Sequence, residues 1–65
     1  MPDELLRIHE LLRIRIVIEQ AKGVVAERTG LDIADAFAWL CEHAGSRNLA
    51  VAEAAQAIVD STARP

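Results

Sequence analysis

The chain has 65 residues, which is enough for one domain and leaves no room for a second. Seven basic and ten acidic residues give a net charge of −3, which argues against indiscriminate coating of nucleic acid, so any contact with RNA or DNA must be local. The single cysteine, Cys41, excludes an intramolecular disulfide, fits a reducing compartment and is expected to act as a small buried hydrophobe.

The chain starts with MPDELLR, which is acidic and amphipathic and therefore unlike a signal peptide. The most apolar stretch, residues 11–26, is interrupted by Arg13, Arg15, Glu19 and Lys22. A membrane span needs about 20 predominantly apolar residues in a row. We therefore expect no contact with a membrane and a cytoplasmic location.

The first predicted helix spans about residues 3–28, where no proline occurs. Apolar side chains recur there at helical spacing, in Leu11, Ile14, Ile18, Ala21 and Val25. Thr29-Gly30 is the predicted stop, because glycine tolerates the left-handed conformation of a helix C-cap.

Two shorter helices follow, and no strand pattern is found. Asp32 is the predicted N-cap of a helix over about residues 32–44, with Asp35 in capping-box register and Gly45 as the stop. The apolar face of this helix is Ile33, Phe37, Leu40 and Ala44. Asn48 is the predicted N-cap of a third helix over about residues 49–60. Its apolar stripe is Val51, Ala54 or Ala55, Ile58 and, at its end, Thr62.

These elements predict an all-α fold, a three-helix bundle with a long first helix, in a single domain over residues 1–65. At ~1.5 Å per residue the first helix is roughly 39 Å long and the others about 18 Å, so the short helices cover only half of it. The tight turn at Gly30 makes this the C-terminal half. Burying each large apolar side chain of the uncovered half is worth ~1.5 to 3 kcal/mol. We therefore predict coiled-coil-like pairing of two copies in a homodimer. The predicted dimer interface is Leu5, Ile8, Leu11 and Leu12.

The run RIVIEQAKGVVAERTG from Arg15, followed by DIADAFAWL, EHA, Asn48 and AEAAQAIV, resembles the ANTAR domain, the RNA-binding domain of transcription antitermination regulators. The resemblance covers about residues 11–59, and VIEQAKG, residues 17–23, is its most specific part. It implies a three-helix bundle, often dimeric, that binds paired RNA hairpins in a leader transcript and prevents a terminator from forming. It also implies a sensor or receiver protein as a partner, because the family usually carries such a domain.

Two interpretations of the basic residues near the motif stay open. Arg15 and Lys22 are seven residues apart, on one helical face, with Glu19 between them. Glu19 can pair with both in a solvated ion-pair ladder, or, as the resemblance implies, Lys22 contacts an RNA phosphate. The residues assigned to RNA binding with the help of the resemblance are Arg15, Lys22, Gly23, Arg28, Arg47 and Asn48.

Gly23 and the two aromatic residues give further expectations. Glycine inside a helix costs roughly 1 kcal/mol relative to alanine, which predicts a close approach to Gly23 by the third helix, through Ala54 or Ala55, or by RNA backbone. Phe37 is assigned to the core. Trp39 lies on the flank of the apolar face, where packing at a domain or dimer edge is favoured over base stacking.

The chain also departs from the ANTAR pattern. Where that pattern usually has basic residues, this chain has Cys41, Glu42, Leu49, Ala50 and Ala52. Each lost phosphate contact lowers the affinity for RNA. The alternative is therefore a diverged protein-interaction module that keeps the bundle and its dimer seam. A DNA-binding helix-turn-helix ranks last, because LAVAEAAQAIVD contains two acidic residues and no lysine or arginine.

No catalytic or metal site is predicted. Cys41 and His43 lie on different sides of a helix, and a zinc site needs three or four converging ligands. No nucleophile and base occur at a recognisable spacing. We therefore expect a protein that is not an enzyme and that needs no cofactor.

Overall fold

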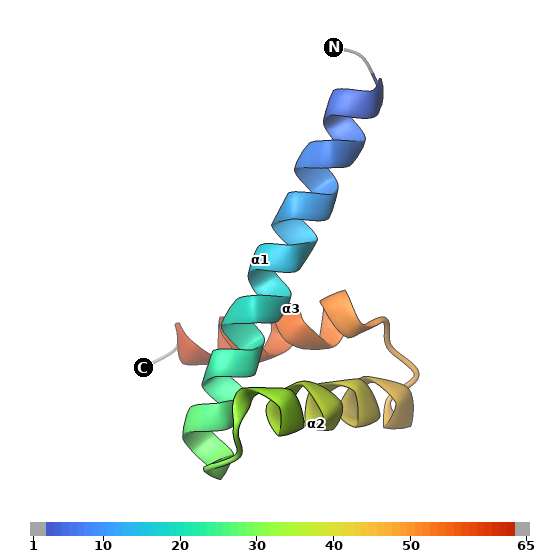
Figure 1. The fold of residues 1–65 in the computed structure, drawn as a ribbon. Coiled ribbons are helices and arrows are strands. Elements are labelled where there is room, and N and C mark those ends of the chain that lie inside the picture. Colours follow the sequence, from blue (N-terminus) through green and yellow to red (C-terminus); the bar gives the residue numbers. More distant parts are fainter. Residues whose placement is uncertain (1–2, 64–65) are drawn as a thin grey trace.

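The computed structural model describes residues 3–63, which form three helices and the turns between them. Helix α1 spans Asp3–Thr29, α2 spans Ile33–Ser46 and α3 spans Val51–Thr62 (Figure 1). The predicted all-α fold with a long first helix is therefore confirmed. The domain predicted over residues 1–65 includes residues 1–2 and 64–65, which lie outside the described part.

The turn between α1 and α2 forms where the sequence predicts it. Gly30 has a left-handed φ of +77°, and its N–H donates to the carbonyl of Ala26 at 2.9 Å. Asp32 is the N-cap of α2, and its side chain accepts a hydrogen bond from the N–H of Asp35 at 2.8 Å. Both roles follow from local chemistry: glycine enters the left-handed region without steric cost, and aspartate offers an acceptor for an unpaired N–H.

Asn48 has a different role from the predicted one. Helix α2 continues through Gly45, and Asn48 takes a left-handed φ of 57° after its end. The N–H of Leu49 donates to the carbonyl of Ala44 at 2.8 Å, and the N–H of Asn48 donates to that of Gly45 at 3.1 Å. This pair of hydrogen bonds is a Schellman C-cap, which asparagine can complete because it tolerates the left-handed region. The predictions that Gly45 ends the second helix and that Asn48 starts the third are therefore wrong.

Helix α3 begins two residues later than predicted, with Ala50 as its N-cap. Alanine has no side-chain acceptor, so only one half of a capping box can form. That half is present, because the Glu53 carboxylate accepts a hydrogen bond from the N–H of Ala50 at 3.0 Å. Thr62, predicted to end the apolar stripe of this helix, is exposed.

The core consists mainly of alanine. Its buried side chains are Ala21, Val25, Ala36, Leu40, Ala44, Ala54 and Ala55. Leu40 is the largest fully buried side chain. Because alanine ends at Cβ, the three helices can approach one another closely. Larger apolar side chains are partly buried around this core, namely Val17, Ile18, Val51, Ile58 and Val59.

Two side chains of the predicted apolar face of α2 are exposed: Ile33 by 51% and Phe37 by 40%. The row that α2 buries instead includes Ala36 and Leu40. Because Ala36 lies four residues before Leu40, the buried face is rotated toward this row, and Ile33 and Phe37 are left on one flank.

Helix α1 projects beyond the other two helices, which lie across its C-terminal half (Figure 1). It is continuous over 27 residues, and its first buried side chain is Ala21. The exposed apolar side chains of the projecting half are Leu5, Leu6, Ile8, Leu11, Leu12 and Ile16. The predicted overhang of apolar residues in the single chain is therefore confirmed.

Substitution of Leu40 by alanine is expected to remove most of the stability of the domain. Truncating a buried leucine costs about 2–5 kcal/mol, whereas a domain of this length has a total free energy of unfolding of roughly 3–10 kcal/mol. Urea unfolding followed by the helical circular dichroism signal measures the loss. Leu6→Ala is the matched control, because Leu6 is 53% exposed. Equal midpoints for the two variants would contradict the assignment of Leu40 as the centre of the core.

Candidate nucleic-acid interface

Lys22 is held in place by two neighbours. Its Nζ lies 2.8 Å from Oε1 of Glu19, and it also lies 5.1 Å from the centroid of the Phe37 ring on α2. The Lys22 side chain is only 17% exposed, because its stem is covered. The structure thus forms the Glu19–Lys22 step of the predicted ion-pair ladder. It also gives Phe37 a role outside the core, as a surface for the ammonium group.

The charge of Lys22 acts on Glu19. The hydrogen bond from Lys22 is the main cause and lowers the pKa of the Glu19 carboxyl below its ordinary value. Desolvation opposes this change, and the charges of Lys22 and Arg15 lower the pKa as well. Arg15 is exposed on the preceding turn of α1. Arg15, Glu19 and Lys22 therefore form one electrostatic group on α1.

Gly23 is exposed, and a Cβ atom built on it would meet nothing within 4 Å. The predicted close packing of Ala54 or Ala55 on Gly23 is therefore wrong. Both alanines pack in the core with Ala21 instead. The missing side chain leaves an open strip of helix backbone beside Lys22.

The remaining basic candidates lie at two other places. Nη1 of Arg28 donates to Oγ of Ser61 at 3.3 Å, which ties the end of α1 to the end of α3. Arg47 is exposed and forms the C-cap of α2, and Asn48 follows it. The structure thus places Arg28 beside α3, and Arg47 and Asn48 together at the end of α2.

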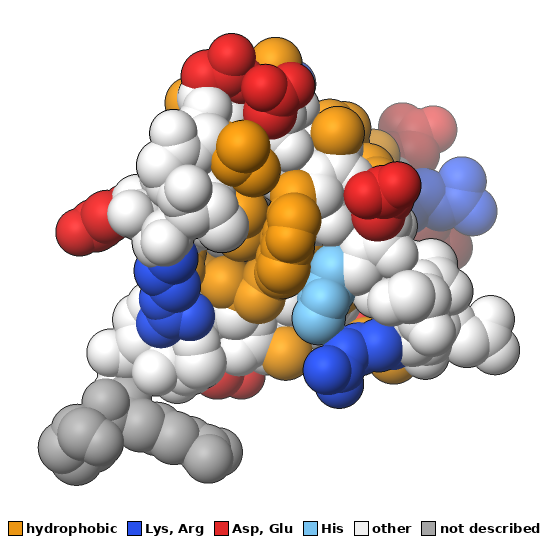
Figure 2. All heavy atoms as spheres, turned by 90° about the horizontal axis from the view of Figure 1, so that it is seen from below, with side chains coloured by type: hydrophobic (Ala, Val, Ile, Leu, Met, Phe, Trp, Pro, Cys, Tyr) orange, Lys and Arg blue, Asp and Glu red, His pale blue; other side chains and the backbone are white. Residues whose placement is uncertain are grey.

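An aromatic pair lies on α2, one turn before Arg47. The rings of Trp39 and His43 are stacked, with centroids 4.8 Å apart and an angle of 10° between their planes. Figure 2 shows an apolar strip that ends against a histidine, with basic side chains on both sides of it. This pair was not predicted, although the sequence carries a signal for it: Trp39, His43 and Arg47 follow one another at intervals of four residues.

A match to a known protein family shows where this chain belongs. The model of the ANTAR domain matches residues 7–59, which is most of the chain. The chain belongs to the ANTAR domain family. ANTAR domains are non-catalytic RNA-binding domains of transcription antitermination. No curated protein and no solved structure matches this chain.

The matched segment of this ANTAR domain begins four residues earlier than the resemblance seen in the sequence, at residue 7. It includes every residue predicted to bind RNA, but it leaves out Leu5 of the predicted dimer interface. Arg15 and Lys22 on α1 both act on Glu19, whereas Arg28 contacts Ser61 of α3 and Arg47 lies at the end of α2. Their contact with RNA stays a prediction.

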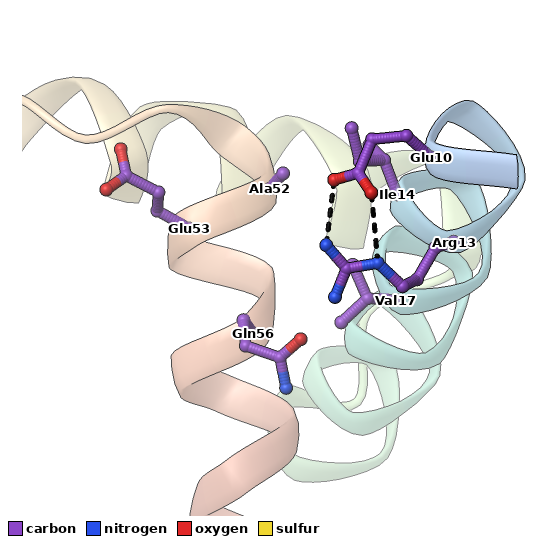
Figure 3. A pocket seen from close by; sticks show the side chains of 7 residues that line it. All are labelled: Glu10, Arg13, Ile14, Val17, Ala52, Glu53 and Gln56. Carbon is purple, nitrogen blue, oxygen red and sulfur yellow. Dashed lines mark hydrogen bonds and ion pairs between the residues drawn. The ribbon is translucent and has the colours of Figure 1, made fainter. Parts of the chain in front are cut away.

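A hollow of about 270 Å³ lies between the projecting half of α1 and the start of α3 (Figure 3). It is lined by Glu10, Arg13, Ile14, Val17, Ala52, Glu53 and Gln56. The guanidinium of Arg13 is paired with Glu10, with Nη2 of Arg13 2.7 Å from Oε1 of Glu10. With two carboxylates on its wall and its arginine already paired, this hollow is a poor site for a phosphate.

Other kinds of site find little support in the described part of the ANTAR domain. Among residues 3–63, no helix combines the length and the apolar content that crossing a bilayer requires. The same residues contain no group of three or more histidine, cysteine, aspartate or glutamate side chains that could hold a metal ion. Cys41, expected to act as a small buried hydrophobe, is half-buried.

Removal of the Lys22 charge is expected to raise the pKa of Glu19 toward its ordinary value. Lys22→Met keeps the apolar stem over Phe37 and removes the hydrogen bond and charge that lower this pKa. Because the folded-state pKa is the lower one, the pair stabilises the fold above the ordinary pKa of glutamate, and this contribution is lost as the pH falls through the lowered value. NMR titration of the Glu19 carboxyl measures the pKa. An unchanged Glu19 pKa in the variant would show that Lys22 does not hold this carboxylate.

Proposed function

We propose that this ANTAR domain acts as a homodimer that binds hairpin RNA in a leader transcript and thereby regulates antitermination. The observation that carries the proposal is the family match over residues 7–59, which contains all of the residues assigned to RNA contact. Those residues are Arg15, Lys22, Gly23, Arg28, Arg47 and Asn48. A cytoplasmic location follows from contact with a nascent transcript.

The charge distribution supports local binding of RNA. The chain carries a net charge of −3, so a phosphate meets attraction only near particular side chains. Arg15, Arg28 and Arg47 are exposed, and Lys22 is oriented by Glu19. Few phosphate contacts imply that the affinity depends only weakly on salt. Contacts that recognise RNA shape and unpaired bases then contribute a larger share of the affinity.

The projecting half of α1 supports the homodimer. Leu5, Ile8, Leu12 and Ile16 are separated by three, four and four residues, so they form one stripe along α1. Leu11, also assigned to the interface, lies off this stripe, three residues after Ile8. Each of the four is 46–58% exposed. Val17 and Ile18, which pack on the core, lie on the other side of the helix. A second α1 can therefore cover this stripe without displacing α2 or α3.

A second candidate function is protein interaction without RNA binding. Half-buried Cys41 and exposed Glu42 and Leu49 lie where the ANTAR pattern usually has basic residues. This exchange removes positive charge and adds apolar and acidic surface, which favours a protein partner over a phosphate backbone. A sensor or receiver protein is the partner that we propose, on the family's usual domain organisation.

RNA binding is tested by titrating the protein with a pool of structured hairpin RNAs at low and moderate salt. Lys22→Met and Arg47→Ala are each expected to weaken binding, and each removed phosphate contact lowers the slope of log affinity against log salt by about 1. Arg13→Ala is the matched control, because Arg13 is exposed but already paired with Glu10. Flat titration curves for every RNA at low salt would overturn RNA binding and leave the protein-interaction function.

The dimer is tested by sedimentation at micromolar concentration. The unchanged protein is expected to have twice the mass of one chain, and Ile8→Gln combined with Leu12→Gln is expected to give a monomer, because two polar side chains then interrupt the apolar stripe. Leu6→Gln is the control: Leu6 is 53% exposed, close to the 54% of Leu12, but lies off the stripe. A single-chain mass for the unchanged protein would rule out this homodimer.

A further inference from the structure

We propose that the Trp39–His43 stack is a platform for one unpaired base of the bound RNA, and that Glu42 beside it favours guanine. The inference rests on the proposed RNA binding and deepens it by naming the part of the hairpin that this surface takes. Three features of α2 carry it: the geometry of the two rings, the hollow beside them and the position of Arg47.

The two rings already form the kind of surface on which a base stacks. Their planes are within 10° of parallel and their centroids are 4.8 Å apart, so a third flat ring can extend the stack. Trp39, the only tryptophan, is 38% exposed. The reason is that the buried row of α2 runs through Ala36 and Leu40 instead. Trp39 thus offers exposed surface to a ligand while it is stacked on His43.

A shallow hollow of about 410 Å³ adjoins the stack and is lined by Trp39, Glu42, His43 and Ser46. The hydroxyl of Ser46 donates to the carbonyl of His43 at 2.9 Å, so its oxygen is left to accept a hydrogen bond. Glu42 is exposed and forms no salt bridge within residues 3–63. Glu42 and Ser46 therefore offer acceptor oxygens at the hollow, and the negative charge of Glu42 repels a phosphate and attracts N–H groups.

A carboxylate beside an aromatic stack distinguishes among the four bases. Guanine carries an N–H and an amino group side by side on its Watson–Crick edge, and the two oxygens of a carboxylate can accept from both in parallel. Adenine and cytosine offer one amino group there, and uracil offers one ring N–H. Glu42 lies three residues after Trp39 and one before His43, and it lines the same hollow. Its carboxylate therefore lies beside the edge of the stacked rings. Guanine is therefore the base that matches this hollow best.

Arg47 supplies the positive charge that the hollow lacks. It is exposed and lies four residues after His43, on the same side of α2 as the two rings. A nucleotide whose base lies on Trp39 can direct its phosphate toward this guanidinium. Bases inside an A-form helix are stacked and paired, so only a loop, bulge or end can present a base in this way. The surface therefore fits the loop of a hairpin rather than its stem.

The test uses hairpins with one common stem and a single guanine or adenine in an otherwise uniform uracil loop, together with a loop-free duplex of the same stem. A mobility shift measures binding, and the fluorescence of Trp39, the only tryptophan, reports stacking. The guanine loop is expected to bind most tightly and to quench the fluorescence. Trp39→Leu is expected to weaken its binding about tenfold or more, and Trp39→Phe to restore most of it. Ile33→Ala, on the other flank of α2, is the control and leaves binding unchanged.

Glu42→Gln tests the choice of base, because it keeps the side-chain size and replaces one acceptor oxygen by a donor. It is expected to remove the preference for guanine over adenine while the adenine loop still binds. Thermal unfolding of each variant shows that it is folded. Hairpins that bind without quenching, and equally well to Trp39→Leu, would overturn the platform and leave the proposed RNA binding intact. No shift with any RNA would overturn both. A guanine preference that survives Glu42→Gln would overturn the role of Glu42.

Discussion

The close approach of three helices through alanine determines most of this structure. Ala21, Ala44, Ala54 and Ala55 leave no room at the centre for a large side chain other than Leu40. Larger apolar groups therefore lie around the core instead of inside it. This is why the two aromatic rings are at the surface, where one supports the ammonium of Lys22 and the other stacks on a histidine. A core of small residues thus leaves aromatic side chains, which would otherwise pack inside, at the surface.

The same constraint explains which predictions succeeded. Helix lengths, the stop at Gly30 and the N-cap at Asp32 depend on local chemistry and could be predicted from the sequence. The buried face of α2 could not, because a hydrophobicity pattern ranks Ile33 and Phe37 above alanine, whereas close packing selects for small size. The predicted end of α2 was wrong for a related reason. Glycine and asparagine both tolerate the left-handed conformation, and only the hydrogen bonds of the formed turn show that Asn48 takes it.

The candidate site was partly predictable. The seven-residue spacing of Arg15 and Lys22 correctly placed them on one face with Glu19 between them. The contact between Lys22 and Phe37 joins two helices, so no spacing within either helix could predict it. Arg28 illustrates the same limit, since its partner Ser61 lies 33 residues away. Pairs within one helix follow from sequence, whereas pairs between helices depend on how the alanine core sets the packing.

The two proposed surfaces occupy different parts of the molecule. The stripe from Leu5 to Ile16 lies on the half of α1 that the bundle leaves uncovered, whereas Lys22, Trp39 and Arg47 lie on the bundle itself. Pairing of two α1 helices would therefore bury the stripe and leave the RNA-contact candidates of the bundle accessible. Arg15 is the exception, because it precedes Ile16 and is also one of the charges that act on Glu19. Arg15 is the residue at which the proposed dimer seam and the proposed RNA surface meet. A coupling between self-association and RNA affinity would therefore act most directly through this residue.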